Sequence, residues 1–181
     1  ILENASIYWG DEMGLSRTDQ RGRSYGRKGV TPTIQKTGSR FRCNMIAAIN
    51  NHGAMRWKVF HVPFTVPVFI DFLRRMTYNS PKKILLILDN HKVHHAKKVT
   101  KWVEKYPDKI ALFYLPPYSP EMNPQELVNQ EIKGHPSNYK LMTSMEALKI
   151  NLRAYLFKIQ SDASKVMRYF QKDSVHFAAD L

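Results

Sequence analysis

The sequence has little cysteine and no long apolar run. Cys43 is its only cysteine, so the chain can form no internal disulfide and no cysteine-rich zinc site, which suits a reducing compartment. No stretch approaches the roughly 18 uninterrupted apolar residues of a membrane span, and the first residues, Ile-Leu-Glu-Asn, lack the regions of a secretory signal. These absences exclude a membrane partner and predict a soluble, cytoplasmic protein. The chain does not begin with methionine, and we expect an upstream segment to precede it.

Acidic residues are also scarce. The 181 residues include 15 aspartates and glutamates against 28 lysines and arginines, which gives a net charge of +13. Hydrophobic residues make up 43% and aromatic residues 12% of the chain, too much for a disordered basic tail. Length and composition therefore predict one folded basic domain over residues 1–181. Such a surface attracts polyanions, of which nucleic acid is the commonest in a cytosol, although simple solubility would also account for the charge.

The basic residues are clustered rather than spread evenly. One group lies among glycines in segment 21–29, and another lies in 92–105, where Lys97 and Lys101 are four residues apart. A helix would place that pair on one face, opposite Val99. A solvated helix face explains any one of these lysines, and only the ensemble favours contact with nucleic-acid phosphates. The candidate DNA-binding residues are Arg21, Arg23, Arg27, Lys28, Lys92, Lys97, Lys98 and Lys101.

Hydrophobic periodicity predicts an α/β protein. Segment 83–89 contains five consecutive apolar residues that end at an acid, which is typical of a strand buried on both faces. Asn123 and Pro124 have the residue types that begin a helix, as N-cap and first helical position. The expected strands are 5–10, 41–50, 55–62, 83–89 and 110–115, and the expected helices begin near 66, 95, 124, 144 and 162. Turn residues at 51–54 indicate a hairpin between the second and third strands. This order predicts a mixed sheet flanked by helices, with extra helices at the C-terminal end.

Three acids stand where the predicted elements meet. Asp11 follows the first predicted strand, Asp89 ends the most buried strand, and Glu126 lies in the first turn of a helix. Carboxyl ends of adjacent strands, with a helix packed across them, can bring such groups into one pocket. Close carboxylates repel each other unless a divalent cation neutralises them, and hard oxygen ligands suit Mg²⁺ or Mn²⁺. Two such ions support in-line phosphoryl transfer, the chemistry of cutting and joining nucleic acid strands.

Each acid also has an ordinary structural explanation. Asp11 could be a turn residue at a strand end, and Asp89-Asn90 could be a turn dipeptide. Glu126 stands three residues after the predicted N-cap, where a capping-box glutamate favours the helix dipole regardless of catalysis. Each explanation is preferable for its residue alone, whereas the three acids together, in a chain this basic, favour a catalytic site.

Two motifs around these acids resemble those of a known family. Asp89-Asn-His-Lys-Val-His94 is similar to the Asp-Asn-x-x-x-His signature of DDE transposases in the mariner superfamily, in particular its bacterial insertion-sequence branch. Tyr114-Leu-Pro-Pro-Tyr-Ser-Pro-Glu-Met-Asn-Pro-Gln-Glu126 is similar to the Leu-Pro-x-Tyr-Ser-Pro-x-x-Asn-Pro-x-Glu signature of the same family. The resemblance implies an RNase H-like, mixed five-stranded catalytic domain. It also implies that Asp11, Asp89 and Glu126 are the catalytic, metal-binding residues.

The resemblance further implies how such a domain works. DDE transposases of this superfamily use two Mg²⁺ or Mn²⁺ ions to cleave DNA at the ends of a mobile element. They join the freed 3′-hydroxyl to double-stranded target DNA as a homodimer assembled on the DNA, which places this protein at the nucleoid. Family members carry a helix-turn-helix region ahead of this domain, which the 181 residues do not contain. Many members have Trp three residues after the glutamate, where this chain has Asn129, as a similar insertion-sequence branch does.

Further residues are expected beside the acids. Four of them should surround the metal-binding carboxylates and orient their loops: Glu12, Asn90, His94 and Asn123. His91, His94 and His95 could indicate a transition-metal site, but no cysteine or second histidine pair accompanies them, so we interpret them as a solvated loop or a DNA contact. Glu131, beyond Glu126 on the same predicted helix, is an alternative third acid. Tyr118 is a candidate for stacking on an unpaired base.

Two other functions remain open from the sequence. One is a catalytically inactive, transposase-derived DNA-binding module, against which the complete set of acids argues. The other is a metal-dependent nuclease of the same fold that cuts DNA without strand transfer. Cleavage and joining assays would separate these functions from transposition.

Overall fold

A computed structural model describes residues 5–16, 28–29, 42–135 and 144–180. At its centre is a five-stranded sheet with the strand order β3-β2-β1-β4-β5. β1 pairs antiparallel with β2 and parallel with β4, so the sheet is mixed, which confirms the sequence prediction. The strands are β1 (Ala5–Ser16), β2 (Arg42–Ile49), β3 (Met55–Phe60), β4 (Lys83–Leu88) and β5 (Ile110–Tyr114).

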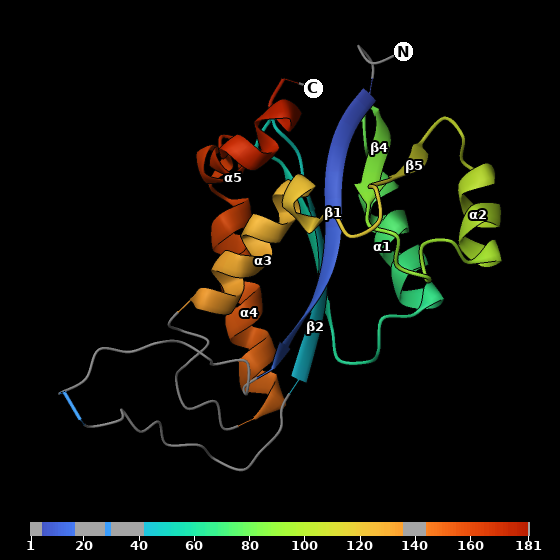
Figure 1. Ribbon diagram of the computed structural model, residues 1–181. Coiled ribbons are helices and arrows are strands. Elements are labelled where there is room, and N and C mark those ends of the chain that lie inside the picture. Colours follow the sequence, from blue (N-terminus) through green and yellow to red (C-terminus); the bar gives the residue numbers. More distant parts are fainter. Residues whose placement is uncertain (1–4, 17–27, 30–41, 136–143, 181) are drawn as a thin grey trace.

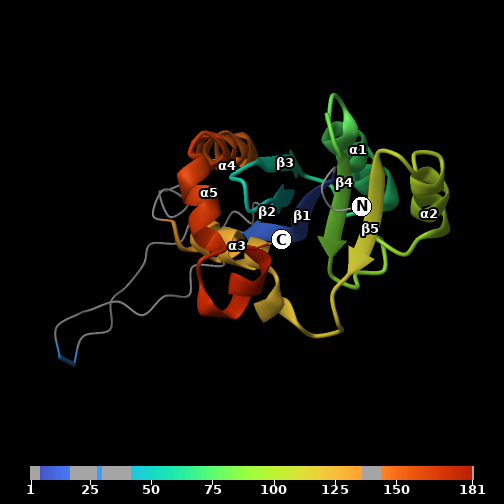
Figure 2. The same cartoon turned by 90° about the horizontal axis from the view of Figure 1, so that it is seen from above.

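Helices cover both faces of this sheet. The helices are α1 (Val66–Thr77), α2 (Lys97–Glu104), α3 (Pro124–Gly134), α4 (Met145–Gln160) and α5 (Ala163–Tyr169). Figures 1 and 2 show α1 and α2 on one side of the molecule and α3, α4 and α5 on the other. The expected C-terminal helices are thus confirmed as α4 and α5. Among the described residues, no helix combines the length and apolarity needed to cross a membrane.

The alternation of side chains along β1 gives the sheet two separate cores. Trp9, Met13 and Leu15 pack with residues of α3, α4 and α5. Tyr8 packs with the α1 residues Phe69 and Phe72 instead. Because successive residues of a strand point to opposite faces, odd-numbered β1 side chains face α3 and even-numbered ones face α1. Neighbouring residues of this strand therefore serve different layers of the protein.

The first strand is longer than the sequence predicts. We expected it to end at Gly10, but β1 continues to Ser16 and pairs with β2 from Trp9–Ile49 to Ser16–Arg42. The Asp-Glu pair at 11–12 has the composition of a turn, but pairing with β2 satisfies the backbone groups there. Asp11 consequently lies within a strand, not in a loop beyond its end.

Two predicted local signals are confirmed. The hairpin between β2 and β3 turns through Gly53, whose φ of +88° favours glycine over any side-chain-bearing residue. Asn123 is the N-cap of α3: its side chain accepts a hydrogen bond of 3.0 Å from the Gln125 N–H, and Pro124 follows it at the first turn. The Asn123 amide also donates to the Gly10 carbonyl at 3.1 Å, which fixes the start of α3 against β1.

Glu131 joins the C-terminal helices to α3. Its carboxylate accepts hydrogen bonds from the hydroxyl groups of Tyr155 on α4 and Tyr169 on α5, and from the Lys165 ammonium. A carboxylate that accepts three donors from two other helices is a structural tie between them. Glu131 is thereby committed to the packing of these helices, so it does not serve as the alternative third acid.

We expect the Glu131→Gln substitution to destabilise the protein. The amide lacks the negative charge that strengthens all three hydrogen bonds. Its NH₂ group also replaces an acceptor oxygen, so a donor then faces other donors. The free energy of unfolding should fall by roughly 2 kcal/mol, the range for hydrogen bonds to charged groups. Urea unfolding would measure this, with the exposed Glu104→Gln as a matched control. Equal stabilities of the two variants would contradict the tie.

Candidate active site

The register of β1 against β4 sets two of the three acids side by side. Trp9 pairs with Ile87 in parallel register, and two further residues along each chain bring Asp11 level with Asp89. Asp11 lies on the face of β1 that α3 covers, and Asp89 follows the last residue of β4. The start of α3 is held against Gly10 by Asn123, which brings the first helical turn and Glu126 over the same edge.

The three acids line one cavity of about 430 Å³. Its other wall is the segment Leu115–Pro120, which follows β5. Tyr118 at its rim is fully exposed and has a φ of 58°, a conformation that costs strain in a residue with a side chain. The structure therefore brings together Asp11, Asp89 and Glu126, which the sequence separates by up to 115 positions (126 − 11).

Asn129 links two of the acids, and sequence reasoning did not assign it this role. Its side chain is fully buried and its amide nitrogen donates to Asp11 Oδ2 at 2.7 Å and to Glu126 Oε2 at 3.3 Å. Gln125 donates in turn to Asn129 Oδ1 at 3.3 Å. The sequence did contain one signal of this contact. Asn129 follows Glu126 by three residues, a spacing that places the two side chains on one helix face.

Asp11 is held in a strongly unfavourable environment for a charge. Burial raises its pKa to about 9, and the nearby carboxylates of Glu12, Glu126 and Asp89 add to the effect. A divalent cation beside Asp11 would offset this repulsion and favour the ionised carboxylate. The donor set, which is three carboxylates open to one cavity, therefore fits a hard divalent cation.

Asp89 differs from Asp11 in its electrostatic environment. Partial burial alone would raise its pKa, but hydrogen bonds from the His94 ring and the His91 backbone N–H outweigh burial and hold the pKa below its usual value. Asp89 therefore remains ionised at neutral pH in the absence of any ion. The site thus combines a carboxyl group with a lowered pKa, Asp89, and one with a raised pKa, Asp11.

The neighbouring residues lie close to the acids, as expected from their sequence positions. Asn90 donates its amide to the Leu115 carbonyl, which joins the loops after β4 and β5. His95 is exposed and contacts Asn90 through its ring nitrogen at 3.2 Å. The interpretation of all three histidines as a solvated loop is wrong for His94, which is 0% exposed because the helix and loop around it close over the ring. Its contacts with Glu12 and Asp89 are described below.

The candidate DNA-binding residues fall into two groups. Lys28 is exposed, whereas Arg21, Arg23 and Arg27 lie outside the described residues. The remaining four are exposed on the loop after Asp89 and on α2: Lys92, Lys97, Lys98 and Lys101. α2 begins eight residues after Asp89, and we call these four lysines the basic flank.

The sheet order, its two helical layers and the clustered acids define an RNase H-like catalytic domain. Residues 6–149 match the family of DDE superfamily endonucleases. The chain belongs to this family, as its sequence motifs imply.

Individual relatives agree with this assignment. The insertion element IS630 uncharacterized 39 kDa protein of Shigella sonnei is 23% identical over 152 residues, which are 83% of this chain and 44% of that protein. The crystal structure of the Mos1 mariner paired end complex with Mn superposes with a TM-score of 0.70 at 20% identity, over 93% of this chain and 52% of that chain. The catalytic domain of Mos1 mariner transposase gives a TM-score of 0.59 at 16% identity, over 93% and 77%. The chain thus spans about half the length of the first two relatives, and the structural likeness confirms the fold.

The raised pKa of Asp11 predicts an unusual dependence of stability on pH. Between the unfolded-state pKa of 3.8 and the folded-state pKa of about 9, the folded protein binds more protons than the unfolded chain. Asp11 should therefore make the free energy of unfolding of the metal-free protein fall as pH rises through this window, by about 1.4 kcal/mol per pH unit, and the raised pKa of Glu12 adds to the fall below about pH 7. Urea unfolding in EDTA would measure the slope.

Asp11→Asn provides the matched comparison. The free energy of unfolding of this variant should depend less on pH than that of the wild type and should be larger at pH 8 in EDTA. The reason is that asparagine does not ionise in the unfolded chain, so folding requires no uptake of a proton at this position. Mn²⁺ should stabilise the wild type and have less effect on the variant. A wild-type profile that rises with pH through the same window would refute the assignment.

Proposed function

We propose that this chain is the catalytic domain of a DNA transposase. It would cut phosphodiester bonds at the ends of a mobile element and transfer the freed 3′-hydroxyl into target DNA. The observation that carries the proposal is the convergence of Asp11, Asp89 and Glu126 on one cavity in a member of the DDE superfamily endonucleases. Residues 1–181 would form this single domain.

The three acids would hold two Mg²⁺ or Mn²⁺ ions. Mos1 paired end complexes with Mn and with Mg support this choice of ion. When bound, the ions would activate the attacking oxygen and stabilise the leaving oxygen of an in-line displacement. The same acids would serve hydrolysis and strand transfer, because both reactions displace an oxygen at a phosphodiester phosphorus.

The residues around the acids would position them and the DNA. Asn129 aligns Asp11 with Glu126 through one amide group, so the two carboxylates present fixed oxygens to the cavity. Asn90 and Asn123 hold the loops from which the acids project. Tyr118, exposed at the rim, would stack on an unpaired base next to the reacting phosphate.

The partner would be double-stranded DNA, at the element ends and at the target. The exposed lysines on and before α2 would contact its phosphates beside the cavity. Paired end complexes of Mos1 support a homodimer assembled on DNA, in which each copy supplies one set of acids. Such a protein would act in the cytoplasm at the nucleoid.

Replacing Asp89 with Asn tests the assignment of the acids. The variant should lose DNA cleavage by at least about 100-fold, because bound metal ions supply several kcal/mol of charge stabilisation. Its affinity for DNA should change little. Cleavage of a labelled element end with Mn²⁺ would measure the loss, with the exposed Asp108→Asn as control. Cleavage by Asp89→Asn at the wild-type rate would show that this acid is not required, and cleavage without joined products by the wild type would indicate a nuclease.

A second test concerns the basic flank on α2. DNA affinity should fall steeply as salt is added, with a logarithmic slope of about −0.9 for each phosphate that is neutralised. The double variant Lys97→Ala/Lys101→Ala should reduce the magnitude of that slope by about 1 to 2. Fluorescence anisotropy at several salt concentrations would measure it. Lys158→Ala/Lys172→Ala removes the same charge from exposed positions in the other helical layer and its C-terminal extension, and an equal effect there would refute the specific role of α2.

A further inference from the structure

Glu12 lies on the opposite face of β1 from Asp11. Asp11 contacts Asn129 on α3, whereas Glu12 faces the layer that contains α1 and the loop after β4. The Glu12 side chain is 18% exposed, and burial raises its pKa to about 7, against the lowering effect of His94. Neither Glu12 nor His94 is among the residues that line the cavity. A buried carboxylate at this position needs a partner on its own side of the sheet.

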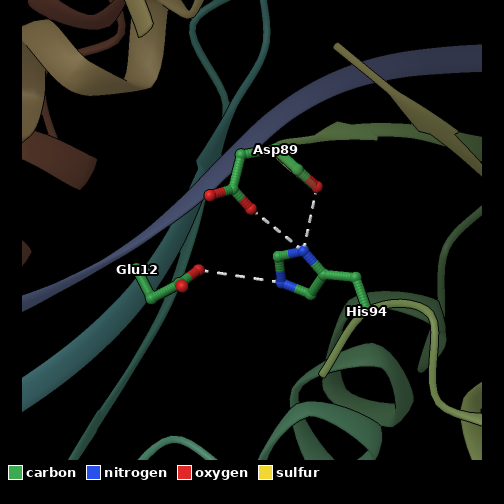
Figure 3. A group of neighbouring side chains, drawn as sticks. All are labelled: Glu12, Asp89 and His94. Carbon is green, nitrogen blue, oxygen red and sulfur yellow. Dashed lines mark hydrogen bonds and ion pairs between the residues drawn. The ribbon is translucent and has the colours of Figure 1, made fainter. Parts of the chain in front are cut away.

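His94 lies between Glu12 and Asp89, as Figure 3 shows. Its Nδ1 is 3.1 Å from the Asp89 backbone carbonyl oxygen and 3.1 Å from Asp89 Oδ1. Two acceptor oxygens at one ring nitrogen require the proton to be on Nδ1. On the other side of the ring, Nε2 is 3.7 Å from Glu12 Oε2, and neither of these two buried atoms has a hydrogen-bond partner. The imidazole is therefore directed at Asp89 by one nitrogen and at Glu12 by the other.

Aromatic rings and backbone hydrogen bonds pack around His94. The Phe69 ring of α1 lies 4.6 Å from the imidazole between centroids, and the Phe64 ring lies 5.6 Å away. The backbone is fixed as well: the His94 N–H donates to the His91 carbonyl, and the Tyr114 hydroxyl donates to the His94 carbonyl. A donor held this rigidly fixes the direction of the carboxylate that accepts from it.

We propose that His94 and Glu12 are positioning residues that set the orientation of Asp89 for divalent-ion binding. His94 acts directly, by holding one carboxylate oxygen of Asp89. Glu12 acts through His94, because its Oε2 faces Nε2 at 3.7 Å and fills the far side of the ring, so that Nδ1 stays turned toward Asp89. The inference rests on the proposed role of Asp89 as a metal ligand. It assigns a contribution to ion affinity to two side chains on the far face of the sheet, outside the cavity.

Glu12, Asp89 and His94 could instead bind a metal ion of their own, and this alternative predicts a different result. One ligand atom from each of Glu12, Asp89 and His94 lies within 4.8 Å of the others, so the group has the spacing of a metal site of its own. An ion held there would add to those held by the three acids, and losing it would lower the number of ions bound. A positioning pair changes the affinity for ions and leaves their number unchanged. We favour positioning because His94 Nδ1 is already committed to two oxygens of Asp89.

The test is calorimetric titration of the whole chain with Mn²⁺ in the absence of DNA. Glu12→Ala and His94→Leu should each weaken Mn²⁺ affinity, by about 10- to 100-fold for loss of the group that orients a ligand. The number of ions bound should stay at the wild-type value. His94→Asn, whose amide N–H can replace Nδ1–H, should recover much of the affinity that His94→Leu loses. The matched control is His95→Asn, at the exposed neighbouring histidine, with no loss of affinity expected.

Melting temperatures separate positioning from a purely structural role. A structural pair would lower the melting temperature and leave the affinity of the folded protein unchanged, which would overturn the proposal. Loss of one bound ion in both Glu12→Ala and His94→Leu would also overturn it, in favour of a separate metal site. Glu12→Ala alone decides the matter if His94→Leu fails to fold. Because the titration contains no DNA, its result does not depend on catalysis. If the two variants bind Mn²⁺ more weakly but the wild type does not cleave DNA, the positioning role is supported and the proposed function is contradicted.

Discussion

The structure depends on keeping negative charges together at one edge of a sheet. Asp11, Asp89 and Glu126 share a cavity, and the pKa of Asp11 shows how costly that proximity is when burial removes water. The fold offsets this cost with backbone geometry. Parallel pairing of β1 with β4 fixes two acids level with each other, and the Asn123 cap fixes the helix that carries the third. The carboxylates cannot separate without breaking the sheet or the helix start.

Each acid has a neutral or basic neighbour that determines its direction. Asn129 donates to Asp11 and Glu126 on the α3 side, and His94 contacts Asp89 on the α1 side. The two supports come from opposite faces of one sheet because adjacent residues of β1 point in opposite directions. The two residues of the Asp-Glu pair at 11–12 therefore contact different layers: Asp11 faces the cavity, and Glu12 faces the layer that contains α1.

Most of the fold and several neighbours of the acids could be predicted from the sequence, but the contacts through which those neighbours hold the acids could not. Apolar runs and the Asn123-Pro124 signal predict elements through local preferences, which survive in the structure. The extension of β1 past Asp11 depends on pairing with β2, which local composition does not reveal. His94 lies in a segment of histidines and a lysine that has the composition of a solvated loop, and only the aromatic rings of α1 and its preceding loop bury it. Asn129 was visible as a departure from a family pattern, but its two contacts required the helix to be placed on the sheet.

The charge of the whole chain and the charge of the cavity are opposite, and the proposed chemistry needs both. The net charge of +13 would draw DNA to the protein over several ångströms of solvent. The carboxylates would repel the same phosphates at close range, so the DNA backbone can enter the cavity only after cations have neutralised them. The exposed lysines of α2 do not line the cavity, so they could hold phosphates of the DNA without competing for the acids. Binding and chemistry would thereby use different residues, and divalent ions would connect them.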